Sequence, residues 1–183
     1  MAFDGITIAN IVYDLKIFSK KLMQNFDLEF YNTLLIDKND FFRQIIETET
    51  NKILRVVKLN EKKPLLEEDL RDNLITGFMS GYYMYFRKVY NDINLKRNTS
   101  LSRAYQVANF YFIREYCYGS MFRYNNNGEF NIPYGGISYN KKILRNGFKI
   151  SMGVTSVLFV VQIMVFSVTG MREAFFRLIG LKS

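Results

Sequence analysis

The sequence predicts a mainly α-helical chain with one β-hairpin and a hydrophobic C-terminal helix. Apolar residues recur at three- and four-residue spacing between positions 17 and 116, which is the period of an α-helix. A segment rich in Asn, Gly and aromatic residues follows, and its centre favours a tight turn. Residues 150–171 then carry no charged side chain, and this length allows a helix to cross a bilayer.

Helices are predicted over residues 17–59. Asp40 is the predicted N-cap of the second helix, because its carboxylate can accept a hydrogen bond from the backbone of the first turn. Glu47 and Glu49 are predicted to lie on a solvated helix face, since no His, Cys or matching carboxylate accompanies them. The apolar positions that mark these helices are Phe26, Phe30, Leu34, Phe41, Phe42, Ile45 and Ile46.

A linker at 62–64 leads to residues 65–90, where one broken helix or two short helices are predicted. Gly77 and Gly81 weaken the middle of this stretch, because glycine is a poor helix former. An aromatic face follows, and core packing is its expected use. It consists of Tyr82, Tyr83, Tyr85, Phe86 and Tyr90.

Ser100 is the predicted N-cap of a further helix over residues 101–116, which leads into the hairpin. The hairpin is predicted at 121–132, with its turn at Asn125–Gly128, because Asn and Gly tolerate the positive φ of a tight turn. Pro133 ends the second arm, since proline cannot donate a hydrogen bond to a β-ladder.

Composition excludes several kinds of site. The 183 residues contain no His, which removes Ser-His-Asp triads, Cys-His dyads and most zinc sites. Cys117 is the single cysteine, so the chain forms no internal disulfide, and a reducing, cytoplasmic location is expected. A buried structural thiol is the expected role of Cys117, because no His is present to activate it.

Positive charge is concentrated around the predicted hairpin. Residues 82–150 carry 11 basic and 3 acidic side chains, whereas residues 1–81 carry 11 basic and 13 acidic ones. Such a field suits a phosphate backbone, and interleaved Tyr and Phe can stack on bases. Ordinary solubilisation of the surface is the alternative interpretation of the charge alone.

The segment 117–135, C-Y-G-S-M-F-R-Y-N-N-N-G-E-F-N-I-P-Y-G, resembles the signature of the D12 class of DNA adenine-N6 methyltransferases, the family of the Dam enzymes. The spacing matches without a gap, and weaker similarity covers residues 28–142. The resemblance implies a fragment of an α/β methyltransferase fold from a restriction–modification system. It also implies double-stranded DNA as the partner and S-adenosylmethionine as the cofactor.

The resemblance implies that this hairpin reads the target site. Arg123 would read a guanine edge, Tyr118 would wedge into the base stack near a flipped adenine, and Met121 would make an apolar base contact. The family usually has Asn-Gly where this chain has Gly119-Ser120, so one side-chain amide is missing. Asn125 and Pro133 complete the implied contact surface, and the residues expected to hold phosphates are Lys141, Lys142, Arg97 and Arg103.

The two catalytic motifs of the family do not occur in these residues. The D-P-P-Y motif is excluded because Pro64 and Pro133 are the only prolines, and no G-x-G precedes the hairpin to bind S-adenosylmethionine. We therefore expect a partial methyltransferase that keeps target recognition and is inactive alone, with a second polypeptide as a source of the missing motifs. The string at 91–94 resembles a short family motif, but it lies so close to the hairpin that we interpret it as chance or a helix stop.

Three regions result: an N-terminal segment at 1–27, the helical and hairpin region at 28–149, and a hydrophobic tail at 150–183. Residues 1–16 resemble the N-terminus of the NFACT/fibronectin-binding family, from which no function is carried over. The alternative function is a small basic protein anchored in a membrane through 150–171; a buried helix is the other interpretation of that tail. A degenerate gene product without a stable role is the third alternative.

Overall fold

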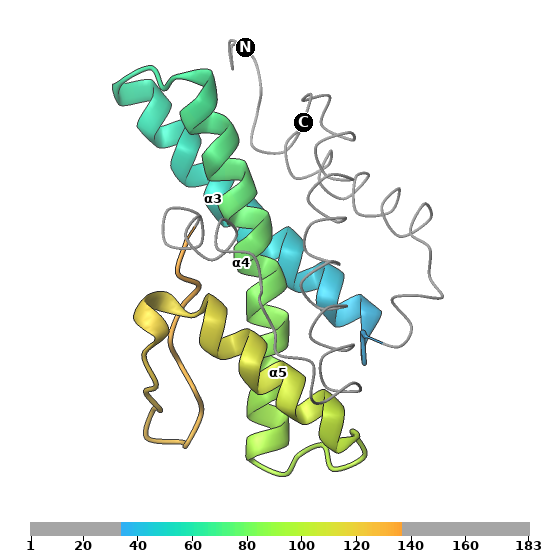
Figure 1. The fold of residues 1–183 in the computed structure, drawn as a ribbon. Coiled ribbons are helices and arrows are strands. Elements are labelled where there is room, and N and C mark those ends of the chain that lie inside the picture. The colour runs from blue at the N-terminus through green and yellow to red at the C-terminus, as the bar shows by residue number, and fades with distance from the viewer. Residues whose placement is uncertain (1–33, 137–183) are drawn as a thin grey trace, which may run out of the picture. The chain divides into compact units, whose positions relative to one another are not determined.

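A computed structural model of the chain describes residues 34–136. These residues are mainly α-helical, as predicted, and the chain divides into two compact units whose described parts are 34–81 and 82–136. One long helix continues from the first unit into the second (Figure 1). The elements in order are α3 (Lys38–Lys62), α4 (Glu67–Asn94), α5 (Arg103–Tyr116) and the short 3₁₀ helix η1 (Tyr118–Ser120).

The N-cap of helix α3 lies three residues before the predicted one. Asp37 is the N-cap, with extended backbone angles, and its side-chain oxygen accepts a hydrogen bond from the backbone N–H of Asp40 at 3.0 Å. The prediction of Asp40 as the cap was wrong, because this residue lies in the first turn and forms an ion pair with Arg43. The helix continues past the predicted end at residue 59 to Lys62, the first residue of the predicted linker, and the N–H of Lys63 donates to the carbonyl of Leu59.

Helix α4 is continuous, so the predicted break at its glycines was wrong. A Cβ atom built on Gly81 would lie 2.6 Å from the Cα of Ile45, and one on Gly77 would lie 3.0 Å from the Cβ of Lys52. Real Cβ atoms do not come as close as 2.6 Å to a backbone atom, and a contact of 3.0 Å is tighter than nearly all real ones. The two glycines therefore allow α3 to cross α4 at short range, and the packing outweighs their low helix propensity.

Glu49 is buried at this crossing, although the sequence predicted a solvated position. Its side chain is 1% exposed, and its carboxylate oxygens have no hydrogen-bond partner within residues 34–136. Burial raises the pKa of Glu49 well above its ordinary value, and the nearby charge of Lys52 opposes this only in part. The helical period of the apolar residues does not reveal this burial, because glycine leaves no mark on a hydrophobic pattern.

Helix α5 begins at Arg103, and its N-cap is Ser102 rather than the predicted Ser100. The hydroxyl of Ser102 accepts a hydrogen bond from the N–H of Tyr105 at 3.2 Å. Ser100 instead bonds the side chain of Asn98 within the turn between α4 and α5. Both serines are chemically suited to a cap, so the course of the turn decides between them.

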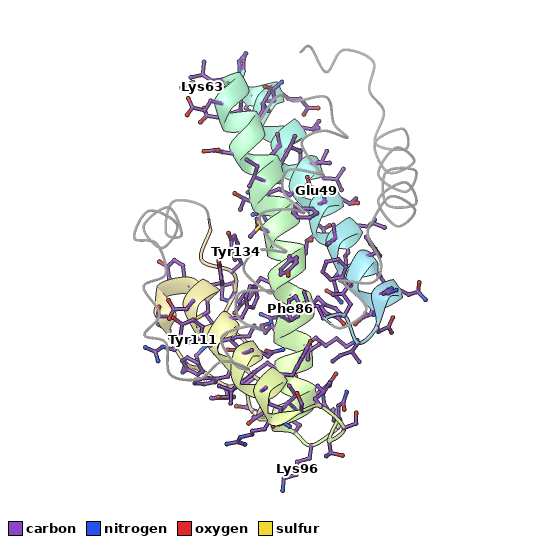
Figure 2. All side chains as sticks on the ribbon, turned by 45° about the vertical axis from the view of Figure 1, so that its right-hand side comes forward. Glu49, Lys63, Phe86, Lys96, Tyr111 and Tyr134 are labelled. Atoms are coloured by element: carbon purple, nitrogen blue, oxygen red, sulfur yellow. The ribbon has the colours of Figure 1, made fainter. Side chains whose placement is uncertain are left out.

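Aromatic rings join α5 to the second half of α4, which confirms the predicted core. The ring centroids of Phe86 and Phe112 lie 5.2 Å apart, those of Tyr82 and Phe112 5.7 Å, and those of Tyr90 and Phe110 6.2 Å. Figure 2 shows Phe86 among the side chains that line α4. Burial of such rings is a large stabilising contribution in a unit of this size.

Residues 117–136 form a loop that turns back on itself, here named the 117–136 loop. The prediction of a β-hairpin at 121–132 is corrected in one respect, because the described residues form no strand there. Two isolated antiparallel bridges remain, Cys117 with Tyr134 and Tyr124 with Phe130. The chain reversal was predicted correctly and the ladder was not.

The hydrophobic helix predicted at 150–171 and the N-terminal segment at 1–27 lie outside the described residues. Within 34–136, no helix combines the length and apolarity that a membrane span requires. The same residues bring together no group of three or more potential metal ligands.

Candidate nucleic-acid interface

The base of the 117–136 loop is closed by backbone hydrogen bonds. The N–H of Tyr118 donates to the carbonyl of Pro133, and the N–H of Gly135 donates to the carbonyl of Tyr116, each at 2.9 Å. Cys117 caps α5 and is fully buried, so its expected role as a structural thiol agrees with its position. Burial raises the pKa of this thiol, which keeps it protonated and unreactive at neutral pH.

The tip of the loop is organised by the side chain of Asn125. Its carbonyl oxygen accepts hydrogen bonds from the backbone N–H groups of Asn127 and Glu129, at 3.0 and 2.9 Å. Its own N–H donates to the carbonyl of Glu129 at 2.8 Å. Gly128 adopts a φ of 75° between them, which glycine accepts without strain. Asn125 therefore acts as the internal brace of the turn.

The second arm of the loop is bound to side chains of α4 instead of to a β-strand. Asn91 accepts from the N–H of Phe130 at 2.8 Å and donates to its carbonyl at 3.1 Å. The hydroxyl of Tyr83 and the guanidinium of Arg87 both donate to the carbonyl of Ile132, at 3.0 and 3.1 Å. Phe130 and Ile132 direct these backbone groups away from the first arm, toward which Glu129 and Asn131 direct theirs. The bonds to α4 therefore satisfy the outer edge of the second arm.

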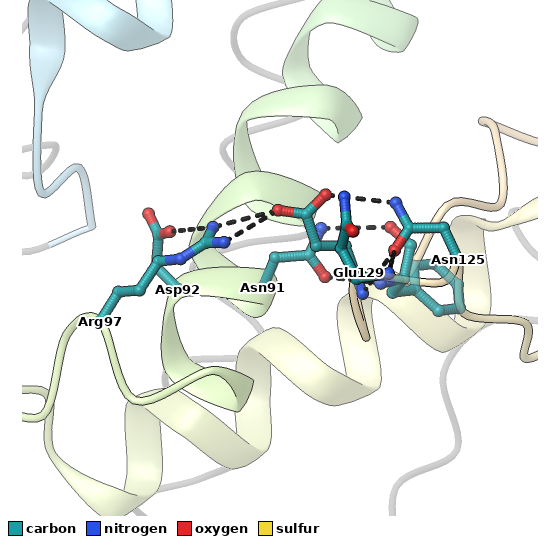
Figure 3. Close-up of polar contacts among 7 residues, drawn as sticks. Asn91, Asp92, Arg97, Asn125 and Glu129 are labelled. Carbon is teal, nitrogen blue, oxygen red and sulfur yellow. Dashed lines mark hydrogen bonds and ion pairs between the residues drawn. The ribbon is translucent and has the colours of Figure 1, made fainter.

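An ion-pair network continues this attachment to the end of α4 (Figure 3). Both terminal nitrogens of Arg97 lie 3.1 Å from one oxygen of Glu129, and Asp92 lies 3.5 Å from the same guanidinium. The amide of Asn125 donates to the other oxygen of Glu129 at 3.2 Å. Hydrogen bonds from Asn125 and Arg97 lower the pKa of Glu129, so its carboxylate stays ionised.

Phe130 anchors the loop from beneath. Its side chain is 1% exposed, and its ring contacts those of Phe122, Tyr90 and Tyr124 at centroid distances of 5.2, 5.7 and 5.9 Å. The hydroxyls of Tyr90 and Tyr124 share a hydrogen bond of 2.8 Å. Burial raises the pKa of Tyr90, so its hydroxyl stays protonated at neutral pH, and either hydroxyl of the pair can be the donor.

Four of the predicted contact residues are exposed on the loop. Tyr118 is 56% and Met121 is 48% exposed, and Arg123 and Pro133 are exposed as well. Tyr118 begins a sharp turn in which Gly119 and Ser120 adopt positive φ angles of 63° and 49°. A flat aromatic ring, a thioether and a guanidinium are thus presented to solvent by a loop whose backbone is held from behind.

The remaining predicted contacts have other surroundings. Asn125 and Arg97 are engaged within the loop and with its attachment to α4, as described above. Arg103 is exposed at the first position of α5. Lys141 and Lys142 lie outside the described residues.

Sequence reasoning missed Asn91, whose two hydrogen bonds fix the second arm of the loop. The string at 91–94 was interpreted as chance or a helix stop, and α4 does end at Asn94. The usable signal was spacing, because Tyr83, Arg87 and Asn91 follow one another at four-residue intervals and so lie on one face of a helix. Asn131, which bonds Arg123, was missed as well.

Comparison with known proteins relates the chain to a methyltransferase. Over 100 aligned residues it is 34% identical to the type II methyltransferase M.MjaIII of Methanocaldococcus jannaschii, and the alignment covers 51% of this chain and 34% of that protein. The chain thus spans about a third of the length of this curated relative. No family model and no solved structure matches the chain.

Proposed function

We propose that the chain is the DNA target-recognition part of a D12-class adenine-N6 methyltransferase. The proposal rests on the difference between the bonded and the exposed groups of the 117–136 loop. Its backbone groups and several polar side chains are used internally or on α4, while Tyr118, Met121, Arg123 and Pro133 are exposed. A loop built only for packing has no need of a solvated ring, thioether and guanidinium on a braced backbone.

The sequence relationship to a type II methyltransferase supports the reaction class. Adenine specificity and the D12 class rest on the loop signature at 117–135. Gly119 departs from the family's usual Asn, yet both residues adopt positive φ more readily than others do. The observed φ of 63° at this position is therefore compatible with the backbone course that the signature implies.

Each exposed residue then has a chemical role. Arg123 reads the O6 and N7 acceptors of a guanine in the major groove. Tyr118 inserts beside the flipped adenine and replaces lost stacking, and Met121 and Pro133 make apolar contacts with bases. The surrounding positive charge holds phosphates and sets the position of the loop without specifying sequence.

Methyl transfer requires groups beyond these 183 residues under this proposal. The chain has no D-P-P-Y motif to hold the adenine amino group and no G-x-G before the loop for S-adenosylmethionine. We propose that a second polypeptide, or a further part of the same protein, supplies both. The purified chain should transfer no methyl group from labelled S-adenosylmethionine to duplex DNA, and measurable transfer would contradict this part of the proposal.

The test of the recognition role is selection of duplexes from a randomised pool by the full chain, followed by affinity measurements as salt is raised. Selective binding that persists at moderate salt is expected. Arg123→Ala should lower the preference for the selected site by roughly 10- to 100-fold, the discrimination of one bidentate guanine contact. Asn126→Ala is the matched control, because Asn126 is exposed on the same loop. Equal selectivity of both variants and the unaltered chain would refute the assignment.

A further inference from the structure

Two arginines bond the 117–136 loop from outside and a third lies within it, and their guanidinium groups make different hydrogen bonds. Arg87 is partly buried and donates to the carbonyl of Ile132. Arg97 uses both terminal nitrogens on Glu129. Arg123 is exposed, and its contact is made by Nε, which donates to the side-chain oxygen of Asn131 at 3.1 Å.

Within residues 34–136, the terminal nitrogens of Arg123 form no hydrogen bond and no ion pair. They belong to the same planar group as Nε, which is held by its hydrogen bond to Asn131. Because the guanidinium is rigid and planar, a bond at Nε restricts the orientation of both terminal nitrogens. Arg123 is therefore held in a way that leaves two parallel donors available.

Asn131 is itself a rigid support. Its backbone N–H donates to the carbonyl of Arg123 at 3.2 Å, so the two residues face each other across the loop. Its neighbours Phe130 and Ile132 are 1% and 2% exposed, and their backbone groups are bonded to α4. The backbone that carries the acceptor side chain of Asn131 is thus fixed relative to α4.

We propose that Asn131 is a positioning residue that directs the two terminal nitrogens of Arg123 end-on at paired acceptors on the edge of a guanine. This inference rests on the proposed function and adds to it the residue that orients the reading group. Nε is occupied, so the side-on mode that pairs Nε with one terminal nitrogen is excluded while the Asn131 bond persists. A side chain ordered before binding loses less conformational entropy on contact, which increases affinity. Its fixed orientation cannot adapt to a base edge without the paired acceptors, which increases discrimination between the right and wrong base.

The test uses the full chain and the duplex that it selects from a randomised pool. Each guanine of that duplex is replaced in turn by 7-deazaguanine, which lacks the N7 acceptor. The dissociation constant of the substituted duplex is then divided by that of the unsubstituted duplex, which gives the 7-deazaguanine ratio. One position should show a ratio of roughly 10 or more for the unaltered chain. In Arg123→Ala the two dissociation constants should become equal, so the ratio should fall to about 1.

Two substitutions at Asn131 separate positioning from folding. Asn131→Leu has a similar size but no acceptor, and we expect the 7-deazaguanine ratio to fall at least threefold. Asn131→Asp keeps the acceptor, so the ratio should be retained even though the added negative charge weakens binding to all duplexes alike. Asn126→Leu, with its side chain exposed at the tip, should leave the ratio unchanged.

A measurement without DNA tests the geometry alone. The Nε–H signal of Arg123 in a nitrogen-15 correlation spectrum should be sharp and slow to exchange in the unaltered chain and in Asn131→Asp. It should broaden in Asn131→Leu, because the proton loses its acceptor. An unchanged signal in Asn131→Leu would overturn the inference.

The outcomes distinguish the inference from the function beneath it. Without sequence-selective binding by the unaltered chain, the proposed function and the inference both fail. If binding is selective and depends on Arg123, but Asn131→Leu retains the full ratio, the recognition role stands and the positioning role of Asn131 is wrong.

Discussion

Along α4, residues 67–81 meet α3 through glycines, whereas residues 82–94 meet α5 and the 117–136 loop through large rings and polar side-chain ends. At Gly77 and Gly81 the missing side chains allow close approach of backbones. At Tyr83, Arg87 and Asn91, side chains reach out to bond loop carbonyls and an N–H. In the first unit, α4 packs closely because two of its residues have no side chain. In the second unit, polar side chains of α4 bond the loop and fix its shape.

This difference separates scaffold from function. Where α3 crosses α4 at the glycines, the carboxyl of Glu49 is buried without a hydrogen-bond partner among the described residues. The close packing of the two helices there tolerates little change. The loop attachment satisfies the polar groups of an irregular segment and so frees the opposite side of that segment for a ligand. Substitutions in the two halves should therefore produce different phenotypes.

The largest effect is expected for Phe130→Ala. Removal of this ring, which is 1% exposed and touches three other rings, should lower the free energy of unfolding of its unit by about 3–5 kcal/mol. Urea denaturation followed by tyrosine fluorescence measures the loss. Phe122→Ala, at a ring that is 40% exposed, is the control and should cost much less.

Asn91→Leu should have the next largest effect. It leaves the N–H and carbonyl of Phe130 without the partners they have in the structure, at a cost of about 2–3 kcal/mol. Hydrogen exchange of the amide of Phe130 should accelerate, while the amides of α3 keep their protection. Asn94→Leu, exposed at the end of the same helix, should change neither. Equal protection in both variants would show that the loop does not depend on this amide.

Gly81→Ala should destabilise the first unit by about 1–3 kcal/mol, the usual cost of overpacking. The gain of about 1 kcal/mol in helix propensity opposes this cost but does not reverse it, since the new methyl meets the backbone of Ile45. Thermal denaturation of the variants measures this loss. Ser80→Ala, at the neighbouring position, is the control and should be neutral or slightly stabilising. A stabilised Gly81→Ala variant would mean that α3 can move away freely.

Glu49→Gln should have the smallest effect at low pH and a growing one as the pH rises. Burial raises the pKa of Glu49 in the folded state, so the folded chain binds this proton more tightly than the unfolded chain does. Stability is then fully present below the unfolded pKa and falls, by up to about 1.4 kcal/mol per pH unit, as the pH rises through the folded pKa. The Gln variant lacks this decline, so it should be the more stable protein at high pH.

Urea denaturation at several pH values measures this difference between the variant and the unaltered chain. Glu47→Gln is the control, since Glu47 is exposed on the same helix and should leave the pH dependence unchanged. Parallel stability profiles for Glu49→Gln and the unaltered chain would show that the buried carboxyl does not titrate with folding.

The sequence by itself determined the helical class, the aromatic core along 82–90, and the reversal of the chain at Asn125–Gly128. These features depend on local periodicity and on residues that tolerate positive φ, and both can be recognised in the amino-acid sequence alone. The sequence also marked Tyr118, Met121, Arg123 and Pro133 as candidates for DNA contact. All four are exposed, and their role in contact stays a prediction.

Tertiary structure decided the rest. Gly77 and Gly81 were predicted to break a helix that packing against α3 keeps whole, and Glu49 was predicted to be solvated at the place where that packing buries it. The predicted β-ladder is reduced to isolated bridges in the described loop, and Asn91, from 39 residues away in the chain, binds the backbone of Phe130 on the edge that faces away from the first arm. Such choices depend on which distant groups meet, and no local pattern records the distance between two helices.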